Sequence, residues 1–414
     1  MTLLAKSAQG KGGPDAIFAY SDMANKRAAE IGRENITNAT IGAFLDEKGK
    51  VLTLKAVEES MRGLDFSDSV TYAPLKGMPR FIEAVIDATF GDYRPQGYIS
   101  AIASPGGTGA IHNAFYNYLN RGEVCITTDY CWGNYRTMLR EMDCTLETFR
   151  TFKDEHFDVE SCLAKAGEVA QKQQNVFMLL NTPAHNPTGF SVADEEWDEV
   201  IKGLKAIAQN GKNNVVLLVD IAYIDFAGKD ARRFMQKFSD LPENFLTLFT
   251  FSLSKGYTLY GYRLGALVAV SSSAEVIAEF DKATAASSRA TWSNCSKAAM
   301  MVMCDFADHA EKMAAFKAQQ EALSQNLKQR AEIFVNEAKA CGLVTLPYQS
   351  GFFLMVPTDT VEIAQEAARI LREEDIFLVP LGKGLRVALC AIVEEKITGL
   401  AERINEALKK AQAK

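Results

Sequence analysis

A lysine that follows an apolar run is the first residue whose setting suggests chemistry. Lys255 comes shortly after the β-prone run 245–251, with Ser252 before it and Arg263 after it. Open α/β sheets bind ligands at the carboxyl ends of their strands. Desolvation there shifts a lysine amine toward its neutral, nucleophilic form, which Schiff-base chemistry requires. Ser252 and Arg263 would then hold an anion nearby. The alternative is a solvated loop lysine with an incidental arginine, and this stretch alone does not decide between them.

A glycine-rich turn lies between a predicted strand and a predicted helix. Residues 104–110 read Ser-Pro-Gly-Gly-Thr-Gly-Ala and include Gly107 and Thr108. Backbone N–H groups at a helix N-terminus bind phosphate well. The turn lacks the third glycine of a dinucleotide fingerprint and the Gly-Lys-Ser/Thr of an NTPase loop. A phosphate site and a plain tight turn both remain open.

Polar residues also follow two other apolar runs. Asn186 lies in Asn-Thr-Pro-Ala-His-Asn-Pro-Thr-Gly, residues 181–189, whose turns would fix an amide over the sheet edge or simply form a rigid connection. Asp220 and Tyr223 follow the run 215–219. A carboxylate at the end of a buried strand needs a partner, and a cationic ring nitrogen would supply one. A metal ion or an N-cap role is the competing interpretation.

Aromatic and histidine residues give weaker signals. Trp132 follows another predicted strand and could stack on a planar ligand or pack in the core. The four histidines, at positions 112, 156, 185 and 309, are far apart with no cysteine or carboxylate at ligand spacing. We therefore predict no metal site.

The elements that must position these residues alternate between strands and helices. Strands are predicted at 99–103, 124–127, 145–149, 176–181, 215–220, 246–251 and 264–270. Helices are predicted between most of them, at 110–120, 135–142, 194–209 and 232–238. Such alternation indicates one large α/β domain with a mostly parallel sheet covered on both faces.

The flanking regions have a different character. Before the sheet, we predict a helix at 21–31 capped by Ser21, an extended segment at 35–44, and helices at 54–63 and 81–89, with Pro79 in the first turn of the last. After Asn294 a helical region runs to about residue 340, and short strands at 352–356, 376–379 and 386–390 with helices at 361–373 and 394–411 predict a smaller α+β domain. The expected division is 1–54 as an N-terminal segment contributing to the small domain, 55–294 as the large domain, and 295–414 as connecting helix and small domain.

Composition narrows the class of protein. A chain of 414 residues is long enough for two domains, and a net charge of -7 disfavours nucleic acid or an anionic membrane as the main partner. Eight scattered cysteines without a Cys-x-x-Cys pair fit reduced thiols in the cytoplasm. No apolar run reaches the roughly 18 residues of a membrane span, and residues 1–16 do not read as a signal peptide. We expect a cytoplasmic protein.

Taken together and in order, these stretches resemble pyridoxal-5′-phosphate-dependent aminotransferases of fold type I, class I, most nearly the aspartate and aromatic amino acid branch. The resemblance rests on Asn-Pro-Thr-Gly at 186–189, Asp-x-Ala-Tyr at 220–223 and Ser-x-Ser-Lys-x(7)-Arg at 252–263, and it extends from Ile41-Gly42 to Arg386. It implies a large domain with a mostly parallel seven-stranded sheet and a smaller α+β domain. It also implies a homodimer with shared active sites.

The resemblance assigns roles to the residues. Lys255 would form the internal aldimine and then move the proton between the substrate Cα and C4′ of the cofactor. Asp220 would pair with the pyridinium N1–H and keep the ring an electron sink. Tyr223 and Asn186 would hydrogen-bond the ring oxygen O3′, and Trp132 would stack on the ring. The expected phosphate ligands are Gly107, Thr108, Ser252 and Arg263, joined by Tyr72 of the neighbouring subunit.

Two arginines and a glycine match substrate positions of the family. Arg386, in Gly-Leu-Arg-Val-Ala, matches the residue that pairs bidentately with the substrate α-carboxylate, and a surface salt bridge is its alternative. Arg289 resembles the distal-carboxylate arginine that reaches across the dimer and is moved aside for aromatic substrates. Gly42, Trp132 and Asn186 complete the expected substrate contacts.

Three departures from the family pattern stand out. Trp292 replaces the usual tyrosine, Cys295-Ser296 replaces the usual Pro-Pro, and Tyr135 sits where a histidine commonly supports the cofactor aspartate. Because of these departures, the sequence does not predict which side chain supports Asp220.

The predicted activity is ping-pong transamination between aspartate, glutamate or an aromatic L-amino acid and a 2-oxo acid. A lyase or decarboxylase that uses the same cofactor is the alternative, because the cofactor alone does not choose which Cα bond breaks. A third class is a non-enzymatic effector-binding module of a transcription regulator. Against it, residues 1–40 show no helix-turn-helix pattern or basic face.

Overall fold

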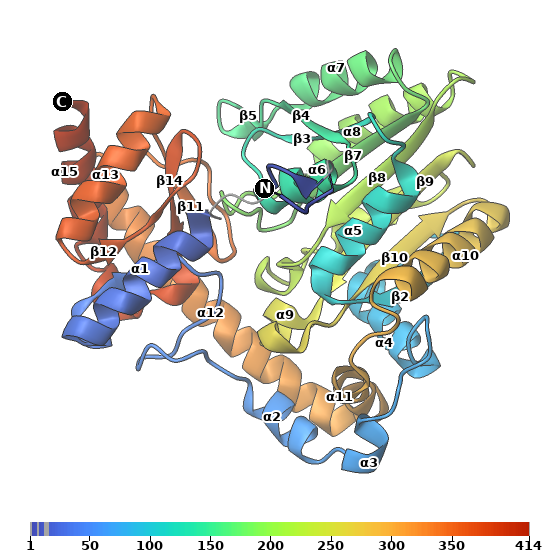
Figure 1. Cartoon of the computed structure of the whole chain (residues 1–414), viewed down its shortest axis with the longest axis horizontal. Coiled ribbons are helices and arrows are strands. Elements are labelled where there is room, and N and C mark those ends of the chain that lie inside the picture. The colour runs from blue at the N-terminus through green and yellow to red at the C-terminus, as the bar shows by residue number, and fades with distance from the viewer. Residues whose placement is uncertain (1, 6–7, 12–15, 414) are drawn as a thin grey trace. The chain divides into compact units, whose positions relative to one another are not determined.

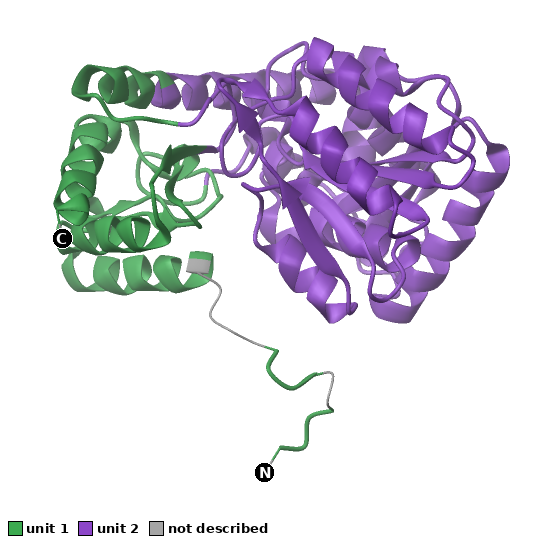
Figure 2. Cartoon of the chain, turned by 90° about the horizontal axis from the view of Figure 1, so that it is seen from above, with its two compact units in different colours: residues 1–51, 332–345, 354–414 green, residues 52–331, 346–353 purple. Residues whose placement is uncertain are grey.

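The computed structural model describes residues 2–5, 8–11 and 16–413 (Figure 1). Residues 1, 6–7, 12–15 and 414 lie outside this description, and with them those parts of the predicted N-terminal and C-terminal segments. The chain divides into two compact units, which Figure 2 distinguishes by colour. Unit 1 comprises residues 1–51, 332–345 and 354–414, and unit 2 comprises 52–331 and 346–353. The division into domains with boundaries after residues 54 and 294 stays a prediction.

Unit 2 is built on a seven-stranded sheet with the order β2-β10-β9-β8-β7-β3-β4. The strands are β2 (Tyr98–Ser104), β3 (Val124–Thr128), β4 (Thr145–Phe149), β7 (Asn175–Asn181), β8 (Asn214–Asp220), β9 (Phe245–Ser252) and β10 (Gly265–Ser271). Only β10 runs antiparallel to its neighbours in this sheet, so the prediction of a mostly parallel seven-stranded sheet is confirmed. The predicted boundaries of these seven strands each lie within one residue of the observed ones.

Side chains on both faces of this sheet are buried, which explains the continuous apolar runs. Leu248 belongs to a core cluster with Phe115 of α5 (Gly106–Tyr118) and Phe280 of α10 (Ala274–Thr291). The next residue, Phe249, meets the edge of Phe90 of α4 (Pro79–Phe90) at a centroid distance of 5.4 Å. Successive side chains of a strand point to opposite faces, so helices cover β9 on both sides.

The remaining elements of unit 2 include two helices that the sequence did not predict. These are α10 and α7 (Val159–Ala170), and α7 packs against α8 (Asp194–Ala208). The helix predicted at 232–238 is a 3₁₀ helix, η5 (Arg233–Phe238). The other elements are α2 (Lys55–Arg62), α3 (Phe66–Ser69), η3 (Gly91–Tyr93), β5 (Phe152–Lys153), β6 (His156–Phe157), α6 (Asn134–Glu141), η4 (Ile224–Phe226), α9 (Leu253–Gly256), η6 (Tyr260–Tyr262) and α11 (Lys297–Asp308).

Unit 1 has mixed α+β structure, as predicted. It holds the three-stranded sheet β11-β14-β13 and a parallel pair of β1 with β12. Its strands and short helices are η2 (Arg33–Asn35), β1 (Thr37–Asn38), β11 (Phe353–Pro357), β12 (Ile376–Phe377), β13 (Val379–Pro380), β14 (Gly384–Ala388), η7 (Leu389–Ala391) and α14 (Glu394–Ile397). Its longer helices are α1 (Ala16–Ile31), α13 (Val361–Glu373) and α15 (Leu400–Gln412), while α12 (Ala310–Cys341) has residues in both units.

Several local predictions for unit 1 are wrong. The strand predicted at 376–379 is two short strands, β12 and β13, which belong to different sheets, and the strand predicted at 386–390 is β14, which ends at Ala388 before the 3₁₀ helix η7. Ser21 does not cap the first helix, because α1 begins at Ala16 and Ser21 lies inside it. The helix predicted at 394–411 is two helices, because Gly399 adopts a φ of 78° and starts α15. Among the described residues, no helix is long and apolar enough to cross a membrane.

Candidate active site

The polar residues singled out in the sequence follow strands whose ends lie at one edge of the sheet. Asp220, the last residue of β8, pairs in register with Asn181 of β7 and Thr250 of β9. Gly265, the first residue of β10, pairs with Ser104 of β2 and Ser252 of β9. Because β10 is antiparallel, its beginning lies where the parallel strands end. The loops after β2, β7 and β8 and the connection from β9 to β10 therefore share one edge, where ligands bind in such sheets.

One part of this edge forms what we call the anion cradle, made by Gly106, Gly107, Ser252, Ser254 and Arg263. Arg263 Nη1 donates to Ser254 Oγ at 3.2 Å and to a backbone carbonyl at 2.9 Å. Gly106 has a φ of 71°, and a Cβ there would lie 2.6 Å from Arg263 Nη2. A Cβ on Gly107 would lie 3.9 Å from Ser252 Oγ. A guanidinium, two hydroxyls and the first turn of α5 thus converge, a combination that suits a phosphate.

Thr108 follows Gly107 in that first turn of α5, so its backbone N–H is among those that a helix leaves without an intrahelical partner. The structure thereby brings together four predicted phosphate ligands from two segments, the one after β2 and the one that joins β9 to β10. They are Gly107, Thr108, Ser252 and Arg263.

Asp220 is buried and held by two donors. Tyr135 donates its hydroxyl to Asp220 Oδ2 at 2.7 Å, and the backbone N–H of Ala222 donates to Oδ1 at 3.2 Å. Burial raises the pKa of Asp220 to about 6, while both hydrogen bonds and the nearby Lys255 act in the opposite direction. Tyr135, which departs from the family pattern, therefore provides the contact whose nature the sequence left open.

Lys255 lies among aromatic rings. Its Nζ is 5.0 Å from the ring centroid of Tyr260, 5.6 Å from that of Tyr223 and 5.7 Å from that of Phe352. The residue occupies α9, a single turn whose N-cap, Ser252, accepts a hydrogen bond from the backbone N–H of Ser254 at 3.2 Å. The side chain is half-buried, so its surroundings differ from those of a fully solvated loop lysine.

Asn186 is anchored to the end of β8 through a second asparagine. Asn181 Oδ1 accepts a hydrogen bond from the backbone N–H of Asn186 at 2.7 Å, and Asn181 Nδ2 donates to the carbonyl of Asp220 at 2.8 Å. This pair of bonds ties the loop after β7 to the loop after β8. The backbone position of Asn186 is therefore set relative to Asp220 and not by its own turn alone.

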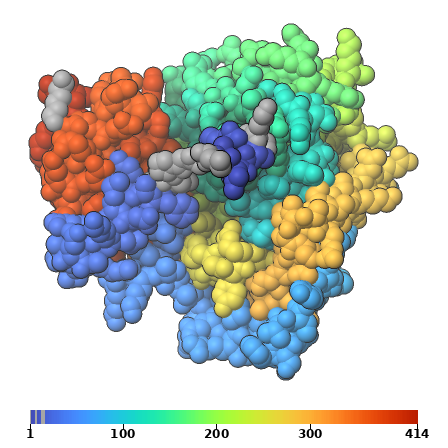
Figure 3. Space-filling view, viewed as in Figure 1, coloured from blue at the N-terminus to red at the C-terminus, as the bar shows by residue number. Residues whose placement is uncertain are grey.

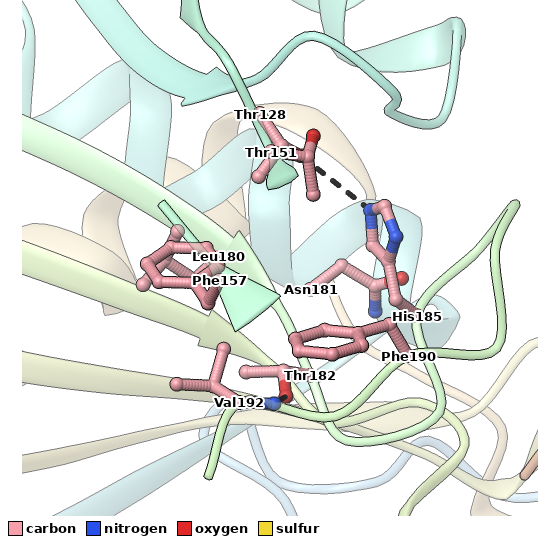
Figure 4. A pocket seen from close by; sticks show the side chains of 9 residues that line it. All are labelled: Thr128, Thr151, Phe157, Leu180, Asn181, Thr182, His185, Phe190 and Val192. Atoms are coloured by element: carbon pink, nitrogen blue, oxygen red, sulfur yellow. Dashed lines mark hydrogen bonds between the residues drawn. The ribbon is translucent and has the colours of Figure 1, made fainter. Parts of the chain in front are cut away.

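A small cavity behind the same loop is lined by His185, Thr128 and seven other residues (Figure 4). His185 Nδ1 lies 2.8 Å from Thr188 Oγ1, and Nε2 lies 3.5 Å from Thr128 Oγ1, the contact dashed in Figure 4. Burial lowers the pKa of His185 to about 4, so the ring is neutral near pH 7. The cavity offers room for no more than a water molecule. We assign these residues to support of the loop.

Trp132 packs against the core, one of the two interpretations of the sequence, and its stacking on a planar ligand stays a prediction. It is partly buried against the core cluster of unit 2, and its ring meets Tyr135 edge-on at 5.4 Å and 87°. It thus packs against the residue that holds Asp220, and part of its surface remains exposed.

Two predicted site residues of unit 2 lie outside these contacts. Tyr72 is 89% exposed, and Arg289, in the last turn of α10, is exposed and donates to Ser293 Oγ. Within the described chain, no hydrogen bond connects Tyr72 or Arg289 with the anion cradle. Figure 3 shows α10 in gold on the surface of unit 2. Trp292 lies nearby in sequence, with its ring edge-on to His112 at 6.2 Å.

Unit 1 contains the other two predicted substrate residues. Arg386 lies in β14, the central strand of its sheet, and is 2% exposed, so a surface salt bridge is the wrong interpretation. Its Nη2 donates to the carbonyl of Thr40 at 2.7 Å, and Ala388 N donates to the carbonyl of Ala39 at 3.1 Å. The segment that carries Gly42 therefore runs beside β14.

Sequence reasoning missed several of these contacts. Ser254 and Asn181 lie inside the stretches quoted above, so their polar side chains beside Lys255 and before Asn186 could have directed attention to them. Tyr260 also lies inside a quoted motif, but Phe352 gave no such signal, because its contact with Lys255 depends on where the chain folds back. In the described ranges, no group of three His, Cys, Asp or Glu side chains could hold a metal ion.

Comparison with known proteins places this arrangement in a family. The model of the family described as aminotransferase class I and II matches residues 34–404. The aromatic-amino-acid aminotransferase of Paracoccus denitrificans is 29% identical over 263 residues, 62% of this chain. The match spans 63% of that enzyme, just under two thirds of its length. Other relatives are aspartate aminotransferases.

Solved structures of aminotransferases share the fold of this chain. The crystal structure of an aminotransferase from Anaerococcus prevotii has a TM-score of 0.94 and 40% identity, covering 97% of this chain and 98% of that chain. An aromatic-amino-acid aminotransferase from Burkholderia pseudomallei, covalently bound to pyridoxal phosphate, shares the fold at a TM-score of 0.79 and 22% identity, covering 98% and 100% of the two chains. The resemblance predicted from the sequence is confirmed, and this chain belongs to the aminotransferase class I and II family.

Proposed function

We propose that this protein is a pyridoxal-5′-phosphate-dependent aminotransferase that moves an amino group from aspartate, glutamate or an aromatic L-amino acid to a 2-oxo acid. The observation that carries the proposal is the meeting of an amine, a buried carboxylate and an anion cradle at one sheet edge. These belong to Lys255, Asp220 and Arg263 with its neighbours. The same three groups match the aldehyde, the ring nitrogen and the phosphate of the cofactor.

The donor set fits this cofactor in a way that is visible in the structure. Asp220 accepts two hydrogen bonds but is so deeply buried that its pKa is raised to about 6. A cationic N–H from a protonated ring nitrogen would favour the ionised form of this carboxylate. The guanidinium of Arg263, next to two hydroxyls and a helix N-terminus, would favour a phosphate dianion.

Once bound there, the cofactor supplies an electron sink for negative charge that develops at the substrate Cα. Asp220 keeps the proton on the ring nitrogen. Lys255 Nζ acts as the base and acid that moves the proton at Cα, a role that its half-buried setting among three rings supports. Asn186 and Tyr223, which lie in the loops after β7 and β8, would bind the ring oxygen.

Substrate binding is assigned to the two arginines. Arg386 would pair with the α-carboxylate, and its burial favours a strong interaction because little water competes. Arg289 would meet the distal carboxylate of a dicarboxylic substrate. The names of the relatives cover both the aspartate and the aromatic class, which supports keeping both substrate classes.

We further propose a homodimer in which Tyr72 and Arg289 complete the partner's site. Both residues are exposed and lie outside the contacts of the anion cradle in their own chain, as residues that serve a second subunit would. A cytoplasmic location is consistent with the eight cysteines, all of which are free thiols. No observation favours the lyase, decarboxylase or effector-binding alternatives.

The decisive experiment combines cofactor mapping with activity. Borohydride reduction of the protein with pyridoxal 5′-phosphate, followed by peptide mapping, should place the cofactor on Lys255. A panel of amino donors with 2-oxoglutarate should yield glutamate in equal amount to the 2-oxo acid formed, whereas a lyase or decarboxylase would not. Lys255→Ala should abolish both results, and Lys229→Ala, at an exposed lysine, should leave both intact. Full transamination by Lys255→Ala would refute the proposal.

A further inference from the structure

Unit 2 contains a cavity of about 380 Å³ that the proposed function does not use. It is lined by residues of α4, η3, the end of α11 and the start of α12, and α4 packs against α11 (Figure 1). None of the described residues that line it belongs to the anion cradle. Its size is within the range of sites that bind small organic molecules.

An apolar wall and several charged groups line this cavity. The apolar wall consists of Ala84, Met303, Met313 and the ring of Tyr257. Four basic and two acidic side chains also line it. Apolar surface with a small number of charged groups is typical of sites that bind a small organic ion in one orientation.

The two arginines of the cavity already have carboxylate partners. Arg80 Nε donates to Asp308 Oδ1 at 2.6 Å, and Arg232 Nη2 donates to Asp225 Oδ1 at 2.8 Å. The side chains of Arg232 and Asp225 are only 16% and 9% exposed. The charges of both arginines are therefore balanced inside the protein.

Lys317 differs from these arginines because it has a hydrogen bond but no ion pair. Its Nζ donates to Gln320 Oε1 at 3.1 Å and lies 5.6 Å from the ring centroid of Phe316. In the described part of the chain, no carboxylate lies within ion-pair distance of this amine, and Asp225 acts on it only from farther away. Solvent reaches Lys317 through the cavity, but the surrounding protein removes part of its hydration and lowers its pKa. An anion in the cavity would compensate for the lost hydration.

Gln320 connects Lys317 to the turn that carries Lys255. Gln320 is 6% exposed, and its Nε2 donates to the carbonyl of Gly256 at 3.0 Å. A Cβ on Gly256 would collide with the carboxylate of Asp225, so the backbone of α9 lies directly against these two side chains. A change at Lys317 can therefore reach the backbone next to Lys255.

We propose that this cavity binds a small organic molecule with one carboxylate, which pairs with Lys317, and that binding acts on α9 through Gln320. A single negative charge fits better than a phosphate dianion, because the exposed Asp87 and Asp92 line the same cavity and repel the dianion more strongly. When the ammonium of Lys317 turns to the carboxylate, Gln320 Oε1 loses its donor and the hold of Gln320 on Gly256 weakens. The coupling to the cofactor site rests on the proposed function, whereas the binding site itself does not.

The first measurement is calorimetric binding of benzoate, which joins one carboxylate to an apolar ring, to the apo-protein. Lys317→Met should weaken binding in the cavity about tenfold or more, because a contact between two charged groups is lost. Lys202→Met, at an exposed lysine of α8, is the matched control and should leave binding unchanged. Benzoate in the proposed substrate site would bind the wild type and Lys317→Met alike, so only the difference between them belongs to the cavity.

The second measurement titrates pyridoxal 5′-phosphate into the protein with and without saturating benzoate. Benzoate should lower the affinity for pyridoxal 5′-phosphate about fivefold, and bound pyridoxal 5′-phosphate should lower the affinity for benzoate by the same factor. Lys317→Met should remove this effect. Gln320→Met, which lacks both the donor and the acceptor, should bind benzoate and show little coupling.

Three outcomes would overturn the inference. Equal benzoate affinity of the wild type and Lys317→Met would remove the binding site. Inorganic phosphate that displaces benzoate from the cavity at equal concentration would contradict the preference for a carboxylate. An affinity for pyridoxal 5′-phosphate that benzoate does not change would contradict the coupling.

Melting curves of the apo-variants report whether each one folds. If Gln320→Met does not fold, the wild-type titration with and without benzoate still decides the coupling. Failure of the wild-type protein to bind pyridoxal 5′-phosphate would contradict the proposed function, whereas benzoate binding to the apo-protein tests the cavity independently.

Discussion

The raised pKa of Asp220 leads to a prediction about stability that runs against the usual effect of mutating a buried residue. In the folded apo-protein, burial raises the pKa of Asp220 from its ordinary value of 3.8 to about 6. Since one pKa unit corresponds to 1.36 kcal/mol, ionising Asp220 in the folded state disfavours folding by roughly 3 kcal/mol at pH 7. Asp220→Asn removes this charge and keeps an acceptor for Tyr135, although the amide cannot also accept from the N–H of Ala222, whose longer bond of 3.2 Å is lost and offsets part of the gain. We expect the apo-variant to be more stable than the wild-type apo-protein at pH 7.

The sign follows from proton linkage. Because the pKa of Asp220 is higher in the folded state, protonated Asp220 favours folding. This contribution to the free energy of unfolding is fully present below about pH 3.8 and is lost as the pH rises through about 6. The advantage of Asp220→Asn should therefore be largest at pH 7 to 8 and should shrink toward pH 4. The variant should at the same time bind pyridoxal 5′-phosphate poorly, a conflict between stability and function that is common at active sites.

The assay is thermal or denaturant unfolding of the two apo-proteins between pH 4 and 8. Asp225→Asn is the matched control, because Asp225 pairs with Arg232 at 2.8 Å and both side chains are largely buried. Asp225→Asn leaves the buried guanidinium of Arg232 without its carboxylate partner. The variant should therefore be less stable than the wild type, and this loss should not turn into a gain at pH 7. An Asp220→Asn apo-protein that is no more stable than wild type at pH 7, or a difference that does not change with pH, would refute the reasoning.

Two further predictions concern binding. Arg289→Ala should reduce kcat/KM for aspartate and glutamate by about ten- to a hundredfold and leave aromatic donors nearly unchanged, since a charge-assisted hydrogen bond serves only the distal carboxylate. Equal loss for all donors in the same assay would contradict that role. Gly106→Ala should weaken binding of pyridoxal 5′-phosphate, because the added Cβ would lie 2.6 Å from Arg263 Nη2 at a φ of 71°. Gly122→Ala has a similarly positive φ of 86° with no atom within 4 Å, so it should alter cofactor affinity little, and equal effects of both changes on a fluorescence titration would argue against the cradle.

The strands of the large sheet were predictable because the apolar pattern of each strand matches its burial in the fold. A strand such as β9 is buried on both faces, so its residues form a continuous apolar run that ends where the sheet ends. Polar residues directly after such runs necessarily lie near one edge of a parallel sheet. This explains why the loops that carry Asn186, Asp220 and Lys255 could be grouped from the order of residues alone.

Other elements lacked a local signal. Helix α10 is rich in alanine, serine and threonine, and large side chains such as Ile277 and Phe280 are few, so its apolar pattern is weak. Helix α1 begins before Ser21 because the preceding residues continue the helix, which a capping residue by itself does not reveal. In these places the helix depends on packing against the rest of the unit.

The sequence by itself determined the family, the seven strands and the residues that could bind a cofactor, because these follow from motif order and from the period of apolar residues. Tertiary structure alone decided how those residues are supported. The bond from Tyr135 to Asp220 and the approach of the Tyr223 and Phe352 rings to Lys255 join segments that are distant in the chain. Such contacts depend on how strands are ordered in the sheet and on which side chains remain to fill the core, and neither is encoded in any short stretch of residues.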